Sequence, residues 1–321
     1  MSEPEVVVVG GGPAGLSAAA TAAAAGARVA LFDEGRRPGG QLRYRLAPVR
    51  ARPGLPLESA AAAADRLTEE AITAGVVISS NAPVWAAFED GSLGVSDDGG
   101  SRLVRPAVVV LATGATDLPL PFAGGSLPGV FSARAVLIAL NAWRVRPGRR
   151  WALVGTGPER DEVAAAIALA GGEVVVIADP AGGDVIAAEG AAGVTAIVVN
   201  GRRRELDCVV VTAGRQPDAA LALMAGCAFA AGAAAANLVP VVDAFGRSTD
   251  PRIVLAGDTA GVCQPEVALA EGRLAGLAAA AAVGRAIDDD LEGALDRERS
   301  LLAERQASRL GLAATYVQPY R

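Results

Sequence analysis

The chain has 321 residues, a length that suits two domains, and 52% of its residues are hydrophobic while 4% are aromatic. Its net charge of -6 argues against broad nucleic-acid binding, which needs a positive surface. Histidine is absent, so histidine-based triads, metal sites and general bases are excluded. The three cysteines form no C-x-x-C pair. We expect a cytoplasmic α/β protein with reduced thiols and no metal site.

The chain opens with a predicted strand at Val6–Val9, four valines that are typical of a parallel strand buried on both faces. A glycine turn, an alanine-rich helix and a second strand, "RVALF", follow. The uncharged run from Val6 to Ala27 raises the question of a membrane span. The turn "GGGPAG" lies inside that run and no positive segment precedes it, so we expect no membrane span and no signal peptide.

The next segments alternate between one helix and several short strands. A helix is predicted over residues 56–76, and the hairpin signals "EDGS" and "DDGG" then predict an antiparallel meander. The Pro/Gly-rich passage over residues 117–129 reads as a crossover into a new domain. A helix is predicted over residues 265–286, and a charged, exposed helix over residues 291–310.

The strand–turn–helix–strand pattern of the opening residues occurs again from Trp151 onwards. This internal duplication predicts an α/β fold of two Rossmann-like dinucleotide-binding domains, each a three-layer ββα arrangement, with the second inserted in the first. We expect the first domain over residues 1–118 and 217–321, and a shortened NAD(P)-type domain over residues 119–216.

The first glycine turn has the G-x-G-x-x-G spacing of a dinucleotide site. Gly10 permits the tight turn, Gly12 lets backbone approach a pyrophosphate, and Gly15 lets the helix pack on the strand. The following helix N-terminus offers free N–H groups to phosphates. Asp33 and Glu34 end the second strand, where a carboxylate can hold ribose hydroxyls. We favour a nucleotide site over a purely structural turn.

Three further stretches favour FAD over NAD in this site. "PGGQL" at residues 38–42 can run along the pyrophosphate, and "LATGA" at residues 111–115 ends a strand with a backbone-exposing turn. "LAGDTAG" at residues 255–261 ends another strand, where Asp258 can bond a ribityl hydroxyl and the next helix N-terminus can favour a reduced flavin. Each stretch alone also fits an ordinary turn.

These motifs, with "TAGRQP", resemble the pyridine nucleotide-disulfide oxidoreductase superfamily in its thioredoxin-reductase-like layout. "PFAGGSLPGVFSARAV" is similar to the α subunits of sarcosine oxidase, opine oxidase and hydroxyproline dehydrogenase and to the B subunit of hydrogen cyanide synthase. The resemblance implies FAD as cofactor and a β subunit of the flavoprotein oxidase type as partner. The candidate cofactor-binding residues are Gly10, Gly12, Pro13, Ala14, Gly15, Asp33, Glu34, Gly40, Gln41, Val84, Ala112, Thr113, Gly114, Gly257 and Asp258.

The sequence also departs from these families. Without C-x-x-C, disulfide reduction is not expected, and no cysteine cluster for an iron–sulfur centre follows Cys263. In the second glycine turn, Arg160 stands at the third glycine position, while Asp179 stands at the ribose-acid position. Two interpretations stay open there, a scaffold without ligand and a surviving NAD or adenylate site. The shortness of this domain favours the scaffold.

Three functions follow from these patterns. The leading one is an FAD-binding α-type subunit of a heteromeric amine or amino-acid dehydrogenase or oxidase, which supports electron transfer while a partner β subunit oxidises the substrate. The second is a free-standing NAD(P)H-dependent FAD oxidoreductase, and the third is a non-catalytic adenine-nucleotide-binding assembly subunit. NAD, an adenine nucleotide and an FMN shared with a partner are left open as further cofactors. No catalytic residue is assigned.

Overall fold

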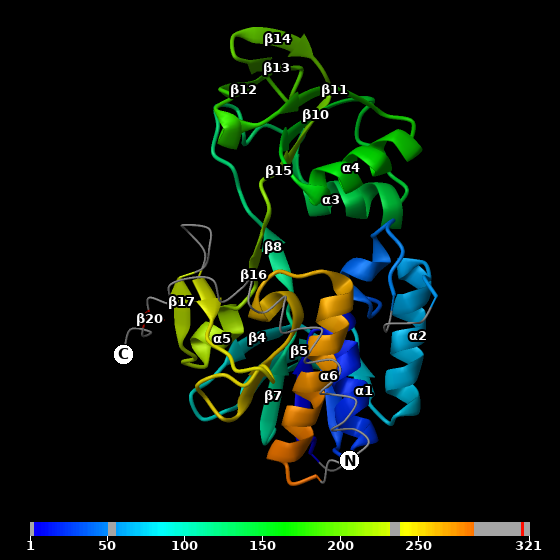
Figure 1. Ribbon diagram of the computed structural model, residues 1–321, viewed down its shortest axis with the longest axis vertical. Helices are drawn as coiled ribbons and strands as arrows, with labels where there is room; N and C mark the ends of the chain where they lie inside the picture. Colours follow the sequence, from blue (N-terminus) through cyan, green and yellow to red (C-terminus); the bar gives the residue numbers. More distant parts are fainter. Residues whose placement is uncertain (1–2, 51–55, 232–237, 286–315, 318–321) are drawn as a thin grey trace. The chain divides into compact units, whose positions relative to one another are not determined.

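The computed structural model describes residues 3–50, 56–231, 238–285 and 316–317 (Figure 1). The chain folds into two compact units. Unit 1 comprises residues 1–43, 48–115 and 216–321, and unit 2 comprises residues 44–47 and 116–215. The helix predicted over residues 291–310 lies outside the described residues. The domain boundaries predicted at residues 118 and 216 stay a prediction.

Unit 1 is built on a parallel sheet of five strands in the order β19-β7-β1-β2-β3. The pairing of β1 is in register on both sides, with Val6 opposite Val29 of β2 and opposite Val108 of β7. The strands are β1 (Val6–Val9), β2 (Val29–Phe32), β3 (Val77–Ser79), β7 (Val108–Leu111) and β19 (Ile253–Leu255).

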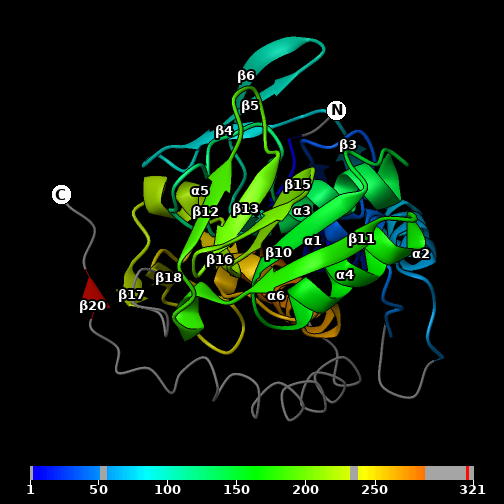
Figure 2. The same ribbon diagram turned by 90° about the horizontal axis from the view of Figure 1, so that it is seen from above.

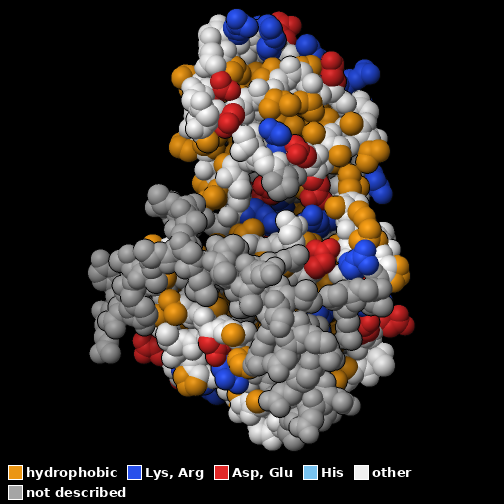
Figure 3. All heavy atoms as spheres, in the orientation of Figure 1, with side chains coloured by type: hydrophobic (Ala, Val, Ile, Leu, Met, Phe, Trp, Pro, Cys, Tyr) orange, Lys and Arg blue, Asp and Glu red, His pale blue; other side chains and the backbone are white. Residues whose placement is uncertain are grey.

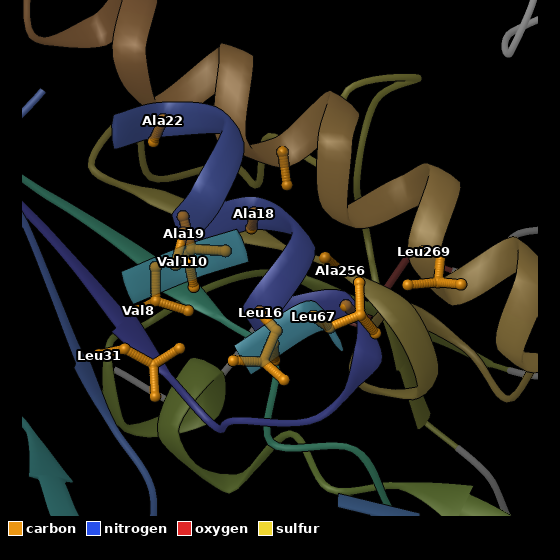
Figure 4. Packing of buried hydrophobic residues seen from close by; sticks show 14 of the residues in the cluster. Val8, Leu16, Ala18, Ala19, Ala22, Leu31, Leu67, Val110, Ala256 and Leu269 are labelled. Carbon is orange, nitrogen blue, oxygen red and sulfur yellow. The ribbon is translucent and has the colours of Figure 1, made fainter. Parts of the chain in front are cut away.

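The two faces of β1 pack against different layers because successive side chains of a strand point to opposite sides. Val6 and Val8 pack with the helical residues, as the close-up of Val8 beside Leu16 shows (Figure 4). Val7 and Val9 instead pack with Leu93 and other residues of the antiparallel meander. The helices are α1 (Pro13–Ala24), α2 (Ala60–Thr73) and α6 (Pro265–Ala282), and the meander is β4 (Val84–Ala87), β5 (Leu93–Asp97) and β6 (Gly100–Val104).

Helices α1 and α6 lie side by side over this sheet (Figures 1 and 4). A Cβ atom on Gly272 would lie 2.3 Å from the Ala14 carbonyl oxygen, and one on Gly276 would lie 2.4 Å from the Ala18 carbonyl oxygen. The two glycines of α6 therefore allow an approach of backbone to backbone that no larger residue permits. The hydroxyl of Ser17 adds a hydrogen bond to the Leu269 carbonyl at 2.9 Å.

Unit 2 repeats the layered plan around a parallel sheet in the order β11-β10-β15-β9. Figure 2 shows β10, β11 and β15 of this sheet. Trp151 and Leu153 of β10 pack on the helical side, while Ala152 and Val154 pack towards a three-stranded antiparallel sheet. The parallel strands are β9 (Val130–Ser132), β10 (Arg150–Gly155), β11 (Glu173–Ala178) and β15 (Cys208–Thr212), the helices α3 (Ala133–Leu137) and α4 (Pro158–Leu169), and the antiparallel strands β12 (Ile186–Glu189), β13 (Ala196–Val199) and β14 (Arg202–Glu205).

The α/β fold with parallel sheets and a thioredoxin-reductase-like layout, predicted from the sequence, is confirmed. The two units differ after their second strands. In unit 1, α2 and β3 follow β2, whereas in unit 2 only the short turn η3 (Pro180–Gly182) separates β11 from β12. Strand β11 is consequently an edge strand, and Ile177 on it is 59% exposed.

The remaining described elements are short. They are η1 (Gly40–Arg43), β8 (Ala115–Asp117), η2 (Ile138–Ala142), β16 (Arg215–Pro217), α5 (Ala220–Met224), β17 (Phe229–Ala231), β18 (Leu238–Pro240), η4 (Gly257–Ala260) and β20 (Tyr316–Val317). Strand β14 carries exposed arginines at the tip of unit 2 (Figure 3), where Arg203 pairs with Glu189. Within the described residues, no helix has the length and apolar character that a membrane crossing needs.

Candidate nucleotide-binding site

The turn between β1 and α1 is closed at the first and third glycines of the motif, Gly10 and Gly15, and open at the second, Gly12. A Cβ atom on Gly10, whose φ is +100°, would lie 2.3 Å from the Ala112 carbonyl oxygen. One on Gly15 would lie 1.8 Å from the Gly10 carbonyl oxygen. Gly12, in contrast, faces open space, with no atom within 4 Å of its Cβ position. The turn thus leaves room for a ligand at the N-terminus of α1, where N–H groups favour phosphates.

An acidic side chain from β2 is directed at this turn. The Asp33 carboxylate accepts hydrogen bonds from the Gly11 N–H and, at 2.7 Å, from the Gly35 N–H. Glu34 is exposed, so Asp33 is the carboxylate at the turn. The Asp33 carbonyl accepts the Ala82 N–H at 2.8 Å, which places the chain entering β4 at Val84 beside the acidic residue.

The loop that contains "GGQL" lies against the same turn. The Gly39 N–H donates to the Gly11 carbonyl at 2.6 Å, and a Cβ atom on Gly40 would lie 2.8 Å from the Gly12 Cα. From the other end of the loop, the Gln41 amide nitrogen donates to the Asp258 carboxylate at 3.2 Å. The loop therefore connects the β1–α1 turn to the turn after β19.

The turn after β7 is joined to the turn after β19 through threonine hydroxyl groups. The Gly114 N–H donates to the Thr259 hydroxyl at 2.7 Å, and the Thr113 hydroxyl lies 3.2 Å from the Thr259 hydroxyl. The Asp258 carboxylate accepts the Cys263 N–H at 2.8 Å. Asp258 is 5% exposed and Thr259 is fully buried. The turns after β7 and β19 therefore form one hydrogen-bonded group beside the turn between β1 and α1.

All the sequence-predicted residues belong to unit 1, and the structure gathers most of them at the carboxyl ends of β1, β2, β7 and β19. Val84 begins β4, and exposed Glu34 does not reach the turn. Sequence reasoning missed Gly11, Thr259 and Glu271, whose side chain accepts the Gly257 N–H. A signal for Glu271 existed, because it is a lone acid in the apolar run "VALAEG". The open space at Gly12 and the nearby carboxylate fit a dinucleotide.

The second glycine turn, in unit 2, keeps the first contact of the motif. A Cβ atom on Gly155 would lie 2.3 Å from the Thr212 carbonyl oxygen, as with Gly10 in unit 1. Gly157 has φ +92° and faces open space. Arg160 is half-buried and pairs with neighbouring Asp161 at 2.9 Å. The third glycine position is therefore filled by a side chain directed at its own helix.

Acidic groups gather at the N-terminus of α4. Burial raises the pKa of Glu159, and the nearby Asp117 carboxylate raises it further, against the lowering effect of Arg215. The Arg215 guanidinium lies 3.7 Å from the Glu159 carboxylate. At the end of β11, the Asp179 Oδ1 atom is buried and has no hydrogen-bond partner among the described residues. Unit 2 thus has an acid after its second strand, as unit 1 does, but it also has carboxylates at the helix N-terminus, where α1 of unit 1 has none.

The comparisons with known proteins agree with this architecture. Residues 4–181 match the family described as pyridine nucleotide-disulphide oxidoreductase, and the chain belongs to that family. The family contains flavoprotein oxidoreductases that bind FAD and NAD(P). The chain is therefore a flavin-dependent oxidoreductase or part of a larger one.

Three individual proteins are similar to this chain in sequence or in structure. The A subunit of opine oxidase from Agrobacterium tumefaciens is 31% identical over 86% of this chain, and the match spans 65% of that protein. The alpha subunit of sarcosine oxidase from Rhizobium meliloti is 33% identical over 54% of this chain and 19% of its own length. The L-proline dehydrogenase structure from P. horikoshii aligns with a TM-score of 0.79 and 25% identity, covering 92% of this chain and 59% of the other. The chain thus spans less than two thirds of the opine oxidase protein and of the proline dehydrogenase chain.

Proposed function

We propose that the chain is the FAD-binding α-type subunit of a heteromeric amine or amino-acid oxidase or dehydrogenase. The observation that carries the proposal is the open cradle at Gly12 beside the Asp33 carboxylate, in a chain similar to the A subunit of opine oxidase. Substrate is oxidised on a partner subunit, and this chain supports electron transfer and assembly. Bound FAD accepts and releases electrons in one-electron and two-electron steps.

The chain's own residues bind and orient the cofactor. Gly12 admits the pyrophosphate to the N-terminus of α1, and Asp33 receives the ribose hydroxyls. The Gly114 and Asp258 turns lie on the other side of β1 from Asp33, because β7 and β19 follow β1 on that side of the sheet. The second half of a dinucleotide therefore extends towards these turns.

Gly12→Val tests the binding site directly. Gly12 has φ -74° and ψ -176°, an extended conformation that valine adopts readily, and its Cβ position meets no protein atom. The variant should fold normally and lose FAD, as measured by visible absorption of the purified protein and by its unfolding midpoint. A Gly12→Val protein that retains a full complement of FAD contradicts the assignment.

The role of the partner is tested by co-expression with a flavoprotein oxidase-type β subunit from the same host. We expect a stable complex in which an amine or amino acid bleaches the flavin of this chain anaerobically, while the isolated chain is not bleached. Bleaching of the isolated chain by the substrate would place substrate oxidation here instead. Nucleotide released by heating also identifies the ligand, and ADP or ATP without flavin would support the assembly-subunit function.

The free-standing NAD(P)H-dependent oxidoreductase is favoured by one observation: the buried Asp179 Oδ1 in unit 2 has no hydrogen-bond partner in the part of the chain that the structure describes. A carboxylate there suits the ribose of NADH and repels the 2′-phosphate of NADPH, and no Lys or Arg occurs in "IADPAGGD" after β11. Stopped-flow mixing separates the functions. Fast bleaching by micromolar NADPH would overturn our preference, whereas no bleaching by either nucleotide supports the heteromeric subunit.

A further inference from the structure

Among the described residues, two acidic side chains are buried, and both make hydrogen bonds at the turn after β19. Asp258 is 5% exposed and Glu271 is 7% exposed. Asp258 belongs to the turn itself, whereas Glu271 comes from the second turn of α6. Burying a carboxylate is unfavourable unless hydrogen bonds compensate it, so each of these acids has a structural reason for its position.

Glu271 holds the backbone at the first residue of this turn. Its Oε2 atom accepts the Gly257 N–H at 3.1 Å. Gly257 has φ +67°, and a Cβ atom there would lie 2.7 Å from the Cβ of Ala14 in α1. The backbone of Gly257 is thus held between the carboxylate of α6 and the first turn of the phosphate-binding helix.

The same turn carries groups that face the candidate cofactor site. Asp258 accepts bonds from Gln41 and from the Cys263 N–H, and Thr259 accepts the Gly114 N–H. A shift of Gly257 would move these groups together. Glu271 is not a partner in these three hydrogen bonds, and its bond to the Gly257 N–H reaches them through the backbone of the turn.

Helix α6 also fixes where α1 lies, through Gly272 against the Ala14 carbonyl and through the bond from Ser17. The N-terminus of α1 and the turn after β19 are consequently held by consecutive residues, Gly272 and Glu271. Glu271 contacts the turn, whereas Gly272 contacts α1. The carboxylate can therefore be removed without removing the packing of α6 on α1.

We propose that Glu271 is a positioning residue that fixes the Gly257–Thr259 turn for the half of the cofactor that lies beyond the pyrophosphate. This inference rests on the proposed function, in which unit 1 binds FAD. ADP uses only the Gly12 and Asp33 side of the site, so it serves as a probe that Glu271 does not affect.

The test compares the affinities of FAD and ADP for the full-length apoprotein. Glu271→Leu leaves the Gly257 N–H without its acceptor and should weaken FAD binding at least tenfold while changing ADP binding less than threefold. Glu271→Gln keeps a carbonyl oxygen and should retain FAD affinity within threefold of wild type. Glu266→Leu is the matched control, because Glu266 lies on the same helix and accepts the Arg50 N–H. It should leave both affinities within threefold.

Each result has a distinct meaning. If wild type binds ADP but not FAD, the proposed function fails before Glu271 is tested. If wild type binds FAD and Glu271→Leu binds it equally well, only the positioning role fails. Equal losses of FAD and ADP affinity also overturn it, because they indicate a general disturbance of α6 and α1. A Glu271→Gln variant as weak as Glu271→Leu overturns it too, because the hydrogen bond would then not explain the loss.

Discussion

The two glycine turns begin alike and then diverge. Gly10 and Gly155 each allow a carbonyl oxygen of the neighbouring strand to come within 2.3 Å of the Cβ position. At the third position, a Cβ on Gly15 would lie 1.8 Å from the Gly10 carbonyl, whereas unit 2 accommodates Arg160. The first glycine of the motif therefore serves the strand-to-helix turn in both units. The third is occupied by glycine only in unit 1, although both helices begin three residues after the first glycine of their motif.

The units also differ in charge at the helix that follows the turn. Helix α1 has no acidic residue in its first turn, while α4 has Glu159 and Asp161 there. Carboxylates stabilise a helix N-terminus by themselves, through the same field that attracts a phosphate. Unit 1 has no carboxylate at that position, and unit 2 fills it with its own side chains. The comparison teaches that a preserved fold and a preserved binding site are separate properties.

The largest effect that sharpens this comparison is expected at the third position of the motif. Gly15→Ala introduces a Cβ 1.8 Å from a backbone oxygen, so unit 1 should lose about 3 kcal/mol or more of unfolding free energy along with bound FAD. Arg160→Ala should change stability by about 0.5 kcal/mol or less. Urea denaturation measures both. Equal destabilisation by the two variants would show that the two turns pack alike.

The next largest effect, on FAD affinity, is expected from Asp33 and Asp179, the acids predicted to bind a ribose. Asp33→Ala removes the acceptor of the Gly11 and Gly35 N–H groups and should weaken FAD binding by about 1.4 kcal/mol or more, a factor of ten. Asp179→Ala should leave FAD affinity unchanged, because Asp179 belongs to unit 2. Fluorescence titration of the apoprotein measures both. A large loss of FAD affinity in Asp179→Ala would mean that FAD binds in unit 2.

Much of the fold could be predicted from local patterns. The valine runs and glycine turns specify β1, β7 and β10 because burial on both faces leaves few alternatives. The site was predicted less completely. Asp33 and Glu34 are adjacent after β2, and only the twist of the chain decides which of them faces the turn. The contact of Ser17 with Leu269 joins residues 252 positions apart, so no local pattern could reveal it. Glu271 was missed for a different reason: the lone acid in the apolar run of α6 was visible in the sequence, but its partner, the Gly257 N–H, was not.

A smaller effect concerns the charge that unit 2 places at its turn. Because burial and Asp117 raise the pKa of Glu159, the folded protein binds this proton more tightly than the unfolded chain. The associated stability is complete below the unfolded pKa and is lost as the pH rises through the raised folded value. At pH 7 the buried carboxylate is therefore unfavourable.

Glu159→Gln should raise the melting temperature of the protein by roughly 2 °C at pH 7. The difference from wild type should shrink as the pH falls below the pKa of Glu159 in the unfolded chain, because wild-type Glu159 then becomes protonated in both states. Asp161→Asn, in the same helix turn, is the matched control and should give no rise. A Glu159→Gln protein that is less stable than wild type at pH 7 would show that the pairing with Arg215 outweighs the burial of the carboxylate.

The smallest effect is expected from the cysteine thiols, which occur in both units. Burial, together with Asp207, raises the pKa of Cys208 in unit 2 to about 11, and burial raises the pKa of Cys227 in unit 1. Thiolates are the reactive form, so neither should react with iodoacetamide at pH 7.5 while the protein is folded. Cys263 is half-buried next to the Asp258 turn and should be the one site labelled, as mass spectrometry after digestion will identify.

The same thiols should contribute nothing to electron transfer, because the proposed electron path needs no thiol. A variant with all three cysteines changed to alanine should therefore retain FAD and transfer electrons within a few-fold of the wild-type rate, measured in the complex with the partner. Complete loss of that rate with FAD intact would show that a cysteine takes part after all. Substituting each cysteine singly would then indicate which unit supplies it, since Cys208 belongs to unit 2 while Cys227 and Cys263 belong to unit 1.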